Sequence, residues 1–520
     1  MSKITLLFLL LCGIGYSQTW SDDVAAIVYD KCSKCHHSGG IAPFELMSYS
    51  DVSGMSSSIS AAISSDEMPP WPPDEMYQQY SHSRALTPTQ KTTFLNWISN
   101  GMPTGTMTNA PAPPVFNSGS ILGNGDLTVQ IPTYASKAMG GHDDYVCFSI
   151  PSGLLQNRTI KAMEVVPGNR QIVHHALIYI DPSASYVTDT VGGDCGGPSG
   201  NVTLVGGYTP GSMPMILPSS TSGGLKLGID IPANSNIVFA MHYPDGSFGM
   251  VDSTKVIFHF YPIGETGIRT VSAAPVIQNW TMAIPPEQVV NYTAQYPSTG
   301  GIPIDMSILS VFPHMHLLGE TIKAYAVNAT NDTTKFINIH HWDFHWQDFY
   351  YFKHMQKAEA GSVIKGEASF DNTSSNPHNP HSPPQTVYAG FNTTDEMFIV
   401  YFHYLPYLPG DELYDIESLT NLSVAEITAD QNWQIYPVPF SENITFKPTS
   451  LKAGDIVSIS IYDTQGRLIK KICERQVITS NSSSFIWNGK SEDGYEVNSG
   501  TYFISMNCNG EFSSQTIMKR

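Results

Sequence analysis

The feature that most restricts the fold of this chain is a series of short apolar runs between about residues 120 and 420. Apolar and polar residues alternate within each run, and clusters of Gly, Pro, Asn and Asp separate the runs. The clearest runs read KAMEVV, HALIYI, NIVFAMHY, KVIFHFY, SILSVFP, TIKAYAV and MFIVYFHY. Such alternation with frequent turns is typical of all-β domains. The region is too long for one sandwich, so we predict two β-sandwiches that meet near residues 268–276.

The flanking parts of the chain have a different texture. The first residues, MSKITLLFLLLCGIGYSQ, combine one lysine with a short apolar run and are typical of a secretory signal peptide. Helical patterns follow, then a Pro-rich stretch, and strand patterns return near the end. The predicted parts are a signal peptide (1–18), a helical domain (19–107), a linker (108–124), two β domains (125–267 and 268–425) and a C-terminal β domain (435–520).

Charge and cysteine usage bound the partners and the compartment. The 520 residues carry a formal net charge of −19, which disfavours nucleic acid as a partner. No stretch after the signal peptide has the length and apolar content of a transmembrane helix. The four cysteines after residue 140 form two natural pairs, Cys147–Cys195 and Cys473–Cys508, which suits an oxidising compartment. Spacing alone does not fix this connectivity.

The segment KCSKCHHSGG contains the C-x-x-C-H pattern of covalent haem attachment. Cys32 and Cys35 would form the thioethers, and His36 would be the proximal iron ligand. A disulfide between the two cysteines is the alternative. Met68, in the stretch EMPPWPPDE, is the candidate sixth ligand because the prolines hold it in an extended segment. Its rivals are Met47, Met55 and His37.

This N-terminal region resembles the small single-haem cytochrome c domains, in which an MPPWP-like stretch supplies the axial methionine. The resemblance implies a small all-α fold and one haem c per chain. A Met/His ligand pair raises the reduction potential, which suits relaying electrons better than activating oxygen.

The β region holds most of the 17 histidines of the chain. His314 and His316 are two residues apart, so on a strand both side chains face the same side and can bind one metal. His174 and His175 are adjacent and can share a metal only at a bulge or a strand end. His242 stands alone, and a lone histidine on a strand is more often a satisfied polar group. Imidazole suits copper, and a thioether suits Cu(I).

The order HH, H, HxH and M along the chain resembles the copper type II monooxygenases, the family of peptidylglycine α-hydroxylating and dopamine β-monooxygenases. The motifs that carry the resemblance are VPGNRQIVHHALIY, MHYPDG, HMHLLG and DEMFIVYFHY, within about residues 125–415. It also covers DDYVCFSIP, whose Cys147 lies where the family has a disulfide cysteine. The resemblance implies two jelly-roll-like β-sandwich domains and two coppers per chain.

The resemblance also implies the ligands and the chemistry. In the family, the two coppers face each other across an open cleft. Reduced copper at the Met site binds O2, a hydrogen atom is abstracted from an activated C–H bond, and the other copper supplies the second electron. The implied ligands are His174, His175 and His242 for the electron-transfer copper, and His314, His316 and Met397 for the oxygen-binding copper.

Several positions depart from the peptide-amidating branch of that family. That branch has an Arg two residues before the HxH pair, where this chain has Phe312. Tyr401 matches a substrate-side tyrosine and is a candidate catalytic residue, whereas the Asn of that branch is replaced by Ile399. We therefore expect an apolar or neutral small molecule as the substrate, not a peptide C-terminus. Asp395 and Glu396 are expected to be structural.

The remaining histidines near these motifs have less specific roles. The segment HHWDFHWQDFYYFKHM could line the cleft or bind a stray metal, but its aromatic residues favour a packing role. Its histidines are His340, His341, His345 and His354. His403 lies six residues after Met397 and is a candidate to support the metal ligands from the same face of the strand.

The C-terminal segments IYPVPF, IYDTQGRLI, WNGKSEDG and SGTYFI resemble the sorting domain of the type IX secretion system. The resemblance implies an Ig-like sandwich, export by that machinery across the outer membrane of a Gram-negative bacterium, and removal of the tail or its attachment at the cell surface. An ordinary carbohydrate-binding or Ig-like module is the alternative.

Together these patterns predict a multidomain, mainly β chain with a small all-α domain at its N-terminus. The predicted function is a secreted copper-dependent monooxygenase that hydroxylates a small organic substrate with O2. Its electrons come from an external reductant or redox protein and enter through the fused haem. The alternatives are a copper and haem electron-transfer protein without hydroxylation, and a surface binding protein.

Overall fold

The structure is a computed structural model, and the chain divides into two compact units, Met1–Thr420 and Asn421–Arg520. The described residues are 18–114, 116, 120–190, 202–219, 224–420, 433–448, 452–463, 467–479, 484–508 and 511–520. Strands dominate both units, so the prediction of a mainly β chain is confirmed. Within these ranges, no helix is both long and apolar enough to cross a membrane.

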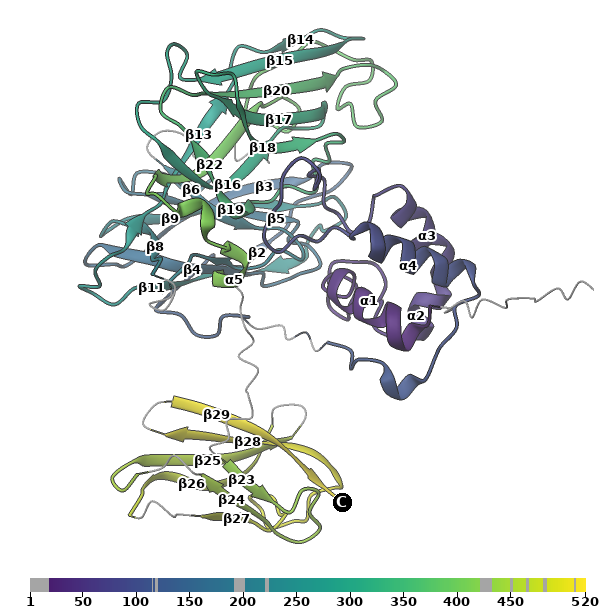
Figure 1. The fold of residues 1–520 in the computed structure, drawn as a ribbon, viewed down its shortest axis with the longest axis vertical. Helices are drawn as coiled ribbons and strands as arrows, with labels where there is room; N and C mark the ends of the chain where they lie inside the picture. The colour runs from purple at the N-terminus through teal and green to yellow at the C-terminus, as the bar shows by residue number, and fades with distance from the viewer. Residues whose placement is uncertain are drawn as a thin grey trace, which may run out of the picture. The chain divides into compact units, whose positions relative to one another are not determined.

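Short helices near the N-terminus form a small group of their own, coloured purple in Figure 1. They enclose a core around Trp20, Phe94 and Trp97, which are fully buried. The longest helix begins where Thr87 caps it, in a capping box with Gln90. The elements are η1 (Trp20–Val24), α1 (Ala25–Lys31), α2 (Tyr49–Gly54), α3 (Ser56–Ser64), α4 (Pro88–Ser99) and η2 (Met107–Asn109). Their assignment to a cytochrome c domain stays a prediction.

The first β domain contains two main sheets that share one apolar core. The outer sheet has the order β1-β11-β4-β8-β12, with β7 paired to β4. Its strands are β1 (Leu127–Gln130), β11 (Lys255–Phe260), β4 (Arg158–Val166), β8 (Leu227–Ile231), β12 (Arg269–Thr270) and β7 (Met215–Ile216). The inner sheet consists of β3 (Asp144–Pro151), β9 (Asn236–Tyr243), β5 (His175–Asp181) and β6 (Thr203–Tyr208) in that order. A small ribbon pairs β2 (Tyr134–Ala135) with β10 (Val251–Asp252).

The second β domain has the same two-sheet plan. Its inner sheet consists of β13 (Ser272–Gln278), β22 (Ile399–Pro406), β16 (Met306–His314) and β19 (Tyr350–Ala358) in that order. Its outer sheet consists of β15 (Val289–Tyr296), β20 (Val363–Asp371), β17 (Gly319–Val327) and β18 (Thr333–Ile339) in that order. The remaining elements are β14 (Ala283–Ile284), β21 (Val387–Tyr388), η3 (Asp411–Leu413) and α5 (Ile416–Thr420). The jelly-roll topology of both domains stays a prediction.

Strand β16, in the inner sheet of the second domain, is buried on both of its faces. All its residues except the first and last are buried, without the alternation of a sheet that has one wet face. One face of the strand contributes Ile308 and Val311 to the core of the second domain. The other contributes Leu309 to the core of the first domain, and Phe312 to a cluster that contains residues from both domains. The two inner sheets therefore pack against each other.

A segment that the sequence analysis assigned to the helical domain packs into the second β domain instead. Tyr80 is 3% exposed, belongs to the core of that domain and forms a β-bridge with Phe352. Its hydroxyl donates to the Phe336 carbonyl at 2.9 Å. Arg84 binds Asp348 at 3.1 Å through side chains that are nearly buried. Prolines and polar residues surround Tyr80 in the sequence. The segment therefore lacks the alternation of apolar and polar residues that would have predicted a place in the β core.

The C-terminal unit is a two-sheet β structure around a core that includes Ile459, Ile461, Trp487 and Ile504. One sheet has the order β23 (Trp433–Tyr436), β24 (Ile444–Pro448), β27 (Phe485–Trp487). The other has the order β26 (Leu468–Val477), β25 (Ile456–Asp463), β28 (Gly500–Cys508), β29 (Glu511–Lys519).

The predicted pairing of Cys473 with Cys508 is wrong. Cys473 is a free thiol and donates to the Val457 carbonyl at 3.7 Å. Cys473 lies opposite Ile459 on one side of β25, and Cys508 lies opposite Val457 on the other side. Neighbouring strands are about 4.8 Å apart, so these two backbones are separated by about 10 Å, which is beyond disulfide reach.

Tyr80 provides a test of the docked segment. We expect Tyr80→Ala to lower the free energy of unfolding by about 3–5 kcal/mol, because a large buried side chain leaves a cavity. Met76 lies four residues earlier and is 90% exposed, so Met76→Ala is the matched control and should change little. Urea unfolding followed by fluorescence measures both. Equal effects of the two substitutions would contradict this packing.

Candidate metal centres

The first centre lies on the inner sheet of the first β domain, where β5 pairs with β9. His175 and His242 are directly opposite each other in the antiparallel register. Residues opposite each other project to the same face, so the two imidazoles meet. Their Nδ1 atoms are 3.2 Å apart. His174 precedes β5, and its backbone N–H donates to the His242 carbonyl at 3.0 Å. The adjacent pair thus lies at a strand end, where both side chains can reach one point.

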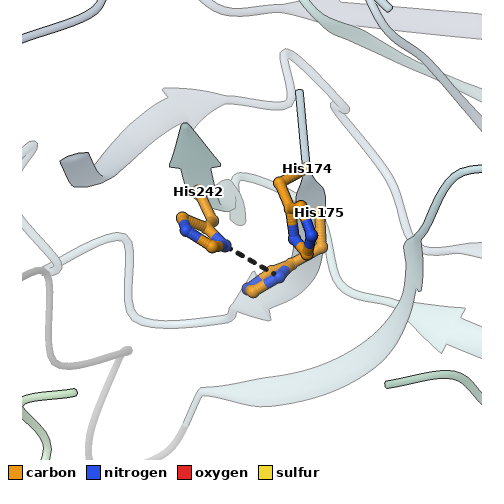
Figure 2. A group of neighbouring side chains, drawn as sticks. All are labelled: His174, His175 and His242. Atoms are coloured by element: carbon orange, nitrogen blue, oxygen red, sulfur yellow. Dashed lines mark hydrogen bonds between the residues drawn. The ribbon is translucent and has the colours of Figure 1, made fainter. Parts of the chain in front are cut away.

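Figure 2 shows the three imidazoles turned toward one another. One nitrogen from each of His174, His175 and His242 lies within 4.8 Å of the other two. Nδ1 of His174 is buried and has no hydrogen-bond partner among the described residues. A buried imidazole nitrogen without a partner is costly, and a metal ion would satisfy it. This donor set therefore fits a metal that prefers nitrogen, such as copper.

The protonation states at this centre also suit a metal. Burial lowers the pKa of His174 to about 3 and holds the pKa of His175 well below its usual value, so both rings are neutral. Metal-binding histidines must be neutral. Nε2 of His242 is 2.7 Å from Asp143 Oδ2, and a carboxylate only accepts, so Nε2 carries the proton. Nδ1 of His242 is thereby left with its lone pair.

The second centre lies where β16 ends and β22 begins. His314 is the last residue of β16 and pairs in register with Ile399, the first residue of β22. His316 follows in the turn after β16, and Met397 precedes β22. The rings of His314 and His316 are 5.0 Å apart and nearly perpendicular. Both histidines and Met397 line one pocket, so the structure brings the predicted second set together.

Hydrogen bonds fix which nitrogen each histidine of the second centre offers. Gln347 Nε2 donates to the Phe344 carbonyl at 2.7 Å, which turns Gln347 Oε1 toward His314 Nδ1 at 2.5 Å. His314 Nδ1 must then donate, and Nε2 keeps its lone pair. His316 Nδ1 lies 3.0 Å from the Asp395 carbonyl and donates to it, so Nε2 of His316 also keeps its lone pair. Burial lowers the pKa of His314 to about 4 and that of His316 to about 3.

Glu396 supports the backbone around this centre, and its carboxylate oxygens bind backbone N–H groups. The side chain is fully buried and accepts the backbone N–H groups of His316 at 2.9 Å, Leu318 at 2.6 Å and Met397 at 3.0 Å. One carboxylate therefore joins the turn that carries His316 to the residue that carries the thioether. Burial raises the pKa of Glu396 to about 8.

One pocket of ≈ 140 Å³ touches both centres. It is lined by His175 of the first set and by all three residues of the second set. Phe344 also lines it, with its ring 6.3 Å from His242 and 5.9 Å from His316. The other lining residues are Tyr145, Leu177, Tyr179, Leu204, Ala240, Met241, Pro275, Gln278, Trp280, Phe312, Phe391, Thr393, Ile399 and Tyr401. No Lys, Arg, Asp or Glu occurs among these described lining residues.

Other predicted site residues lie elsewhere. His403 is buried outside the pocket lining, stacked on Phe349, with Nδ1 2.9 Å from the Ser310 hydroxyl. His354 Nδ1 bonds the Tyr414 carbonyl at 2.9 Å. Cys147 is fully buried, and its sulfur is part of a disulfide. Its predicted partner, Cys195, lies outside the described residues, so that pairing stays a prediction.

The C-x-x-C-H motif follows α1, and its thiols are free, which rules out the alternative disulfide between Cys32 and Cys35. His36 Nδ1 lies 3.0 Å from the Phe44 carbonyl and donates to it, which leaves Nε2 for an iron ion. These donors would suit a covalently attached haem, and the place of His36 on the iron stays a prediction. Met68 follows α3 and is half-buried, and its place on the iron stays a prediction.

The motif also touches the first β domain. A Cβ placed on Gly211 would lie 2.8 Å from Cys35 Sγ, and Gly211 has φ +78°. Only glycine suits this position, because the Cβ of any other residue would strain the backbone at this positive φ and would also clash with Cys35 Sγ. The sequence analysis missed this contact, since a single glycine in a loop carries no sign of its neighbour.

The buried histidines predict an acid-sensitive fold. The imidazoles of His174, His314, His316 and His403 have folded pKa values of about 3 to 4, below the unfolded value near 6.5. The unfolded chain therefore binds protons first, and the metal-free protein should be fully stable above pH 6.5 and lose stability as the pH falls toward 4. The slope is up to about 1.4 kcal/mol per pH unit for each histidine.

Urea titrations of the metal-free protein between pH 7.5 and pH 5 measure this slope. His341→Ala removes an exposed histidine and should leave the profile unchanged. The same urea midpoint at both ends of that range would contradict the buried, neutral state of these rings.

Comparison with known proteins bears on two parts of the chain. Residues 270–417 match the family model of the copper type II ascorbate-dependent monooxygenase C-terminal domain. Residues 434–520 match the family model of the secretion system C-terminal sorting domain. No curated protein matches the chain.

Similar solved structures include PorZ of Porphyromonas gingivalis, a surface component of the type-IX secretion system. It aligns at 19% identity with a TM-score of 0.14, and the alignment covers 24% of this chain and 15% of that chain. Latent PorU of the same organism aligns at 12% identity and a TM-score of 0.15, covering 72% of this chain and 34% of that chain. The chain thus spans less than two thirds of either protein, and scores this low carry no argument about its fold. By the family matches, residues 270–417 are similar to a copper monooxygenase domain, and the sorting domain marks a secreted or cell-surface protein.

Proposed function

We propose that this protein is a secreted copper-dependent monooxygenase with two copper sites in its first unit. His174, His175 and His242 would hold one copper, and His314, His316 and Met397 the other. The observation that carries the proposal is that residues of both sets line one pocket with neutral donor atoms. Copper bound there would supply the reduction of O2 and the abstraction of a hydrogen atom from a C–H bond of the substrate.

The two donor sets suit different tasks. The first set offers imidazole nitrogens alone, whereas the second adds the thioether of Met397, which is 7% exposed. A soft sulfur ligand favours Cu(I), the state that meets O2. The second set is therefore proposed as the site of oxygen chemistry, and the first set as the electron donor.

The pocket walls point to a neutral substrate. Its lining is aromatic and aliphatic apart from the metal-binding residues and a few neutral polar groups, so a charged substrate would lose its hydration without a partner. Phe312, which stands where the resemblance to the peptide-amidating branch would place a carboxylate-binding Arg, lines the pocket. Trp280 and Phe391, with rings 5.0 Å apart, are exposed at the surface and also line the pocket, which suits a planar apolar molecule. We propose a small, neutral, aromatic or apolar substrate.

Tyr401 is proposed to position that substrate. It lines the pocket, and its ring lies 6.2 Å from Phe312. Burial raises the pKa of Tyr401, so the phenol keeps its proton and can donate a hydrogen bond to a polar atom of the bound molecule.

We further propose that Cys32, Cys35, His36 and Met68 hold one haem c, which would supply one-electron transfer to the coppers. Two contacts support a short route. Gly211 packs against Cys35, and Arg84 pairs with Asp348. Asp348 directly follows Gln347 in the sequence, and the side chain of Gln347 contacts His314. The predicted external reductant would then act on the N-terminal region.

Single histidine variants test the copper assignment. We expect two coppers per chain in the wild type and one in His242→Ala and in His316→Ala, because each removes a ligand from one set only. Incorporation of ¹⁸O from labelled O2 into a neutral aromatic substrate should be lost in both. His354→Ala, whose ring lies outside the pocket, should keep both coppers and the product. A His316→Ala variant that still forms product would rule out the second site as the oxygen site.

Substitution of His36 tests the electron route. His36→Ala should slow the reduction of bound Cu(II) by a protein donor by at least about tenfold, if electrons reach the coppers through the haem. Stopped-flow loss of the Cu(II) signal measures this rate, with His354→Ala as the control. Equal rates in the two variants would end the relay proposal and leave the monooxygenase proposal intact.

A further inference from the structure

The loop between β18 and β19, residues 340–349, contacts both metal centres. Gln347 fixes the ring of His314, and the ring of Phe344 lies 6.3 Å from that of His242 and 5.9 Å from that of His316. The same loop places the ring of His345 5.3 Å from the ring of His174. The second β domain therefore brings a fourth imidazole beside His174, one member of the three-histidine group of the first domain.

We propose that His345 is a fourth ligand of the metal bound by His174, His175 and His242, an inference that rests on the proposed function. Ring separations within the three-histidine group are 4.7, 4.7 and 5.8 Å. The 5.3 Å between His345 and His174 falls inside that range, at an interplanar angle of 74°. The ring of His345 is thus at a ligand-like separation from one member of the group, His174, whereas the nitrogens that already lie within 4.8 Å of one another are those of His174, His175 and His242.

The hydrogen bonds of His345 prepare it for this role. Asp343 Oδ1 lies 2.9 Å from His345 Nδ1 and also accepts the His345 backbone N–H at 2.8 Å. Because the carboxylate only accepts, Nδ1 carries a proton, and Nε2 is the nitrogen that would bind a metal in place of its own proton. A carboxylate behind a ligand histidine fixes its tautomer and orientation. Asp143 makes the matching contact to His242.

A fourth imidazole gives the first centre a different character from the second. Sites whose positions are all filled by protein do not take up a small ligand, whereas catalytic sites keep a position open. With His345 as a ligand, the first centre would have four protein ligands and would suit electron transfer, whereas His314, His316 and Met397 supply only three and would leave a position for O2. The metal would also tie the two β domains together beside the pocket.

The test uses the full chain with Cu(II), in a His316→Ala background so that copper at the second centre does not obscure the first. Pulsed EPR and X-ray absorption count the coordinated imidazoles. His345→Ala should lose one imidazole and bind copper at least about tenfold more weakly, and Asp343→Asn should weaken binding to a smaller degree. His341→Ala changes an exposed histidine of the same loop and is the matched control.

The outcomes separate the two claims. The same imidazole count and affinity in His345→Ala and His341→Ala would overturn the fourth ligand and leave the three-histidine copper site in place. No copper at this centre in the parent would overturn the proposed function and this inference together. The side chain of His345 is 48% exposed, so its removal should leave the fold intact, and far-UV circular dichroism of each variant checks this.

Discussion

The apolar contact between the two inner sheets is the interaction on which the site depends. Tyr179, Leu204 and Val238 of the first domain form one cluster with Phe312 of the second. Leu309 and Leu405 of the second domain extend the core of the first. Burial of such side chains contributes about 1.5–3 kcal/mol each, so the two sheets are held firmly in one arrangement. Each donor set lies on these sheets or at the ends of their strands, and Tyr179, Leu204 and Phe312 of the shared cluster also line the pocket.

Each of the two predicted ligand sets is supported by a carboxylate that supplies no ligand atom. Asp143 holds the proton of His242 in place, and Glu396 binds three backbone N–H groups around His316 and Met397. Both acids therefore act by orienting the nitrogen and sulfur donors. This division keeps negative charge out of the pocket, in keeping with its neutral lining. A small, uncharged substrate and a nitrogen- and sulfur-ligated copper are the chemistry that such a pocket suits best.

The sequence revealed those parts of the site that depend on local spacing. A two-residue offset on a strand predicted that His314 and His316 share a face, and adjacency predicted that His174 and His175 meet only at a strand end. Contacts between distant segments left no such pattern. Neither the docking of Tyr80 on Phe352 nor the approach of Phe344 and His345 to the first centre follows from any period, because each arises from loops placed by tertiary packing. The Cys473–Cys508 pairing failed for a related reason, since strand order decides which cysteines are neighbours.

The central claim is that two separate coppers share one pocket. Pulsed dipolar EPR of the Cu(II)-loaded full chain tests it most directly, because dipolar coupling reports the distance between two metal ions. The account predicts two EPR-visible coppers per chain with a resolved dipolar coupling and no bridging ligand, since no residue belongs to both donor sets. A single copper per chain, or an exchange-coupled pair without an EPR signal, would contradict it.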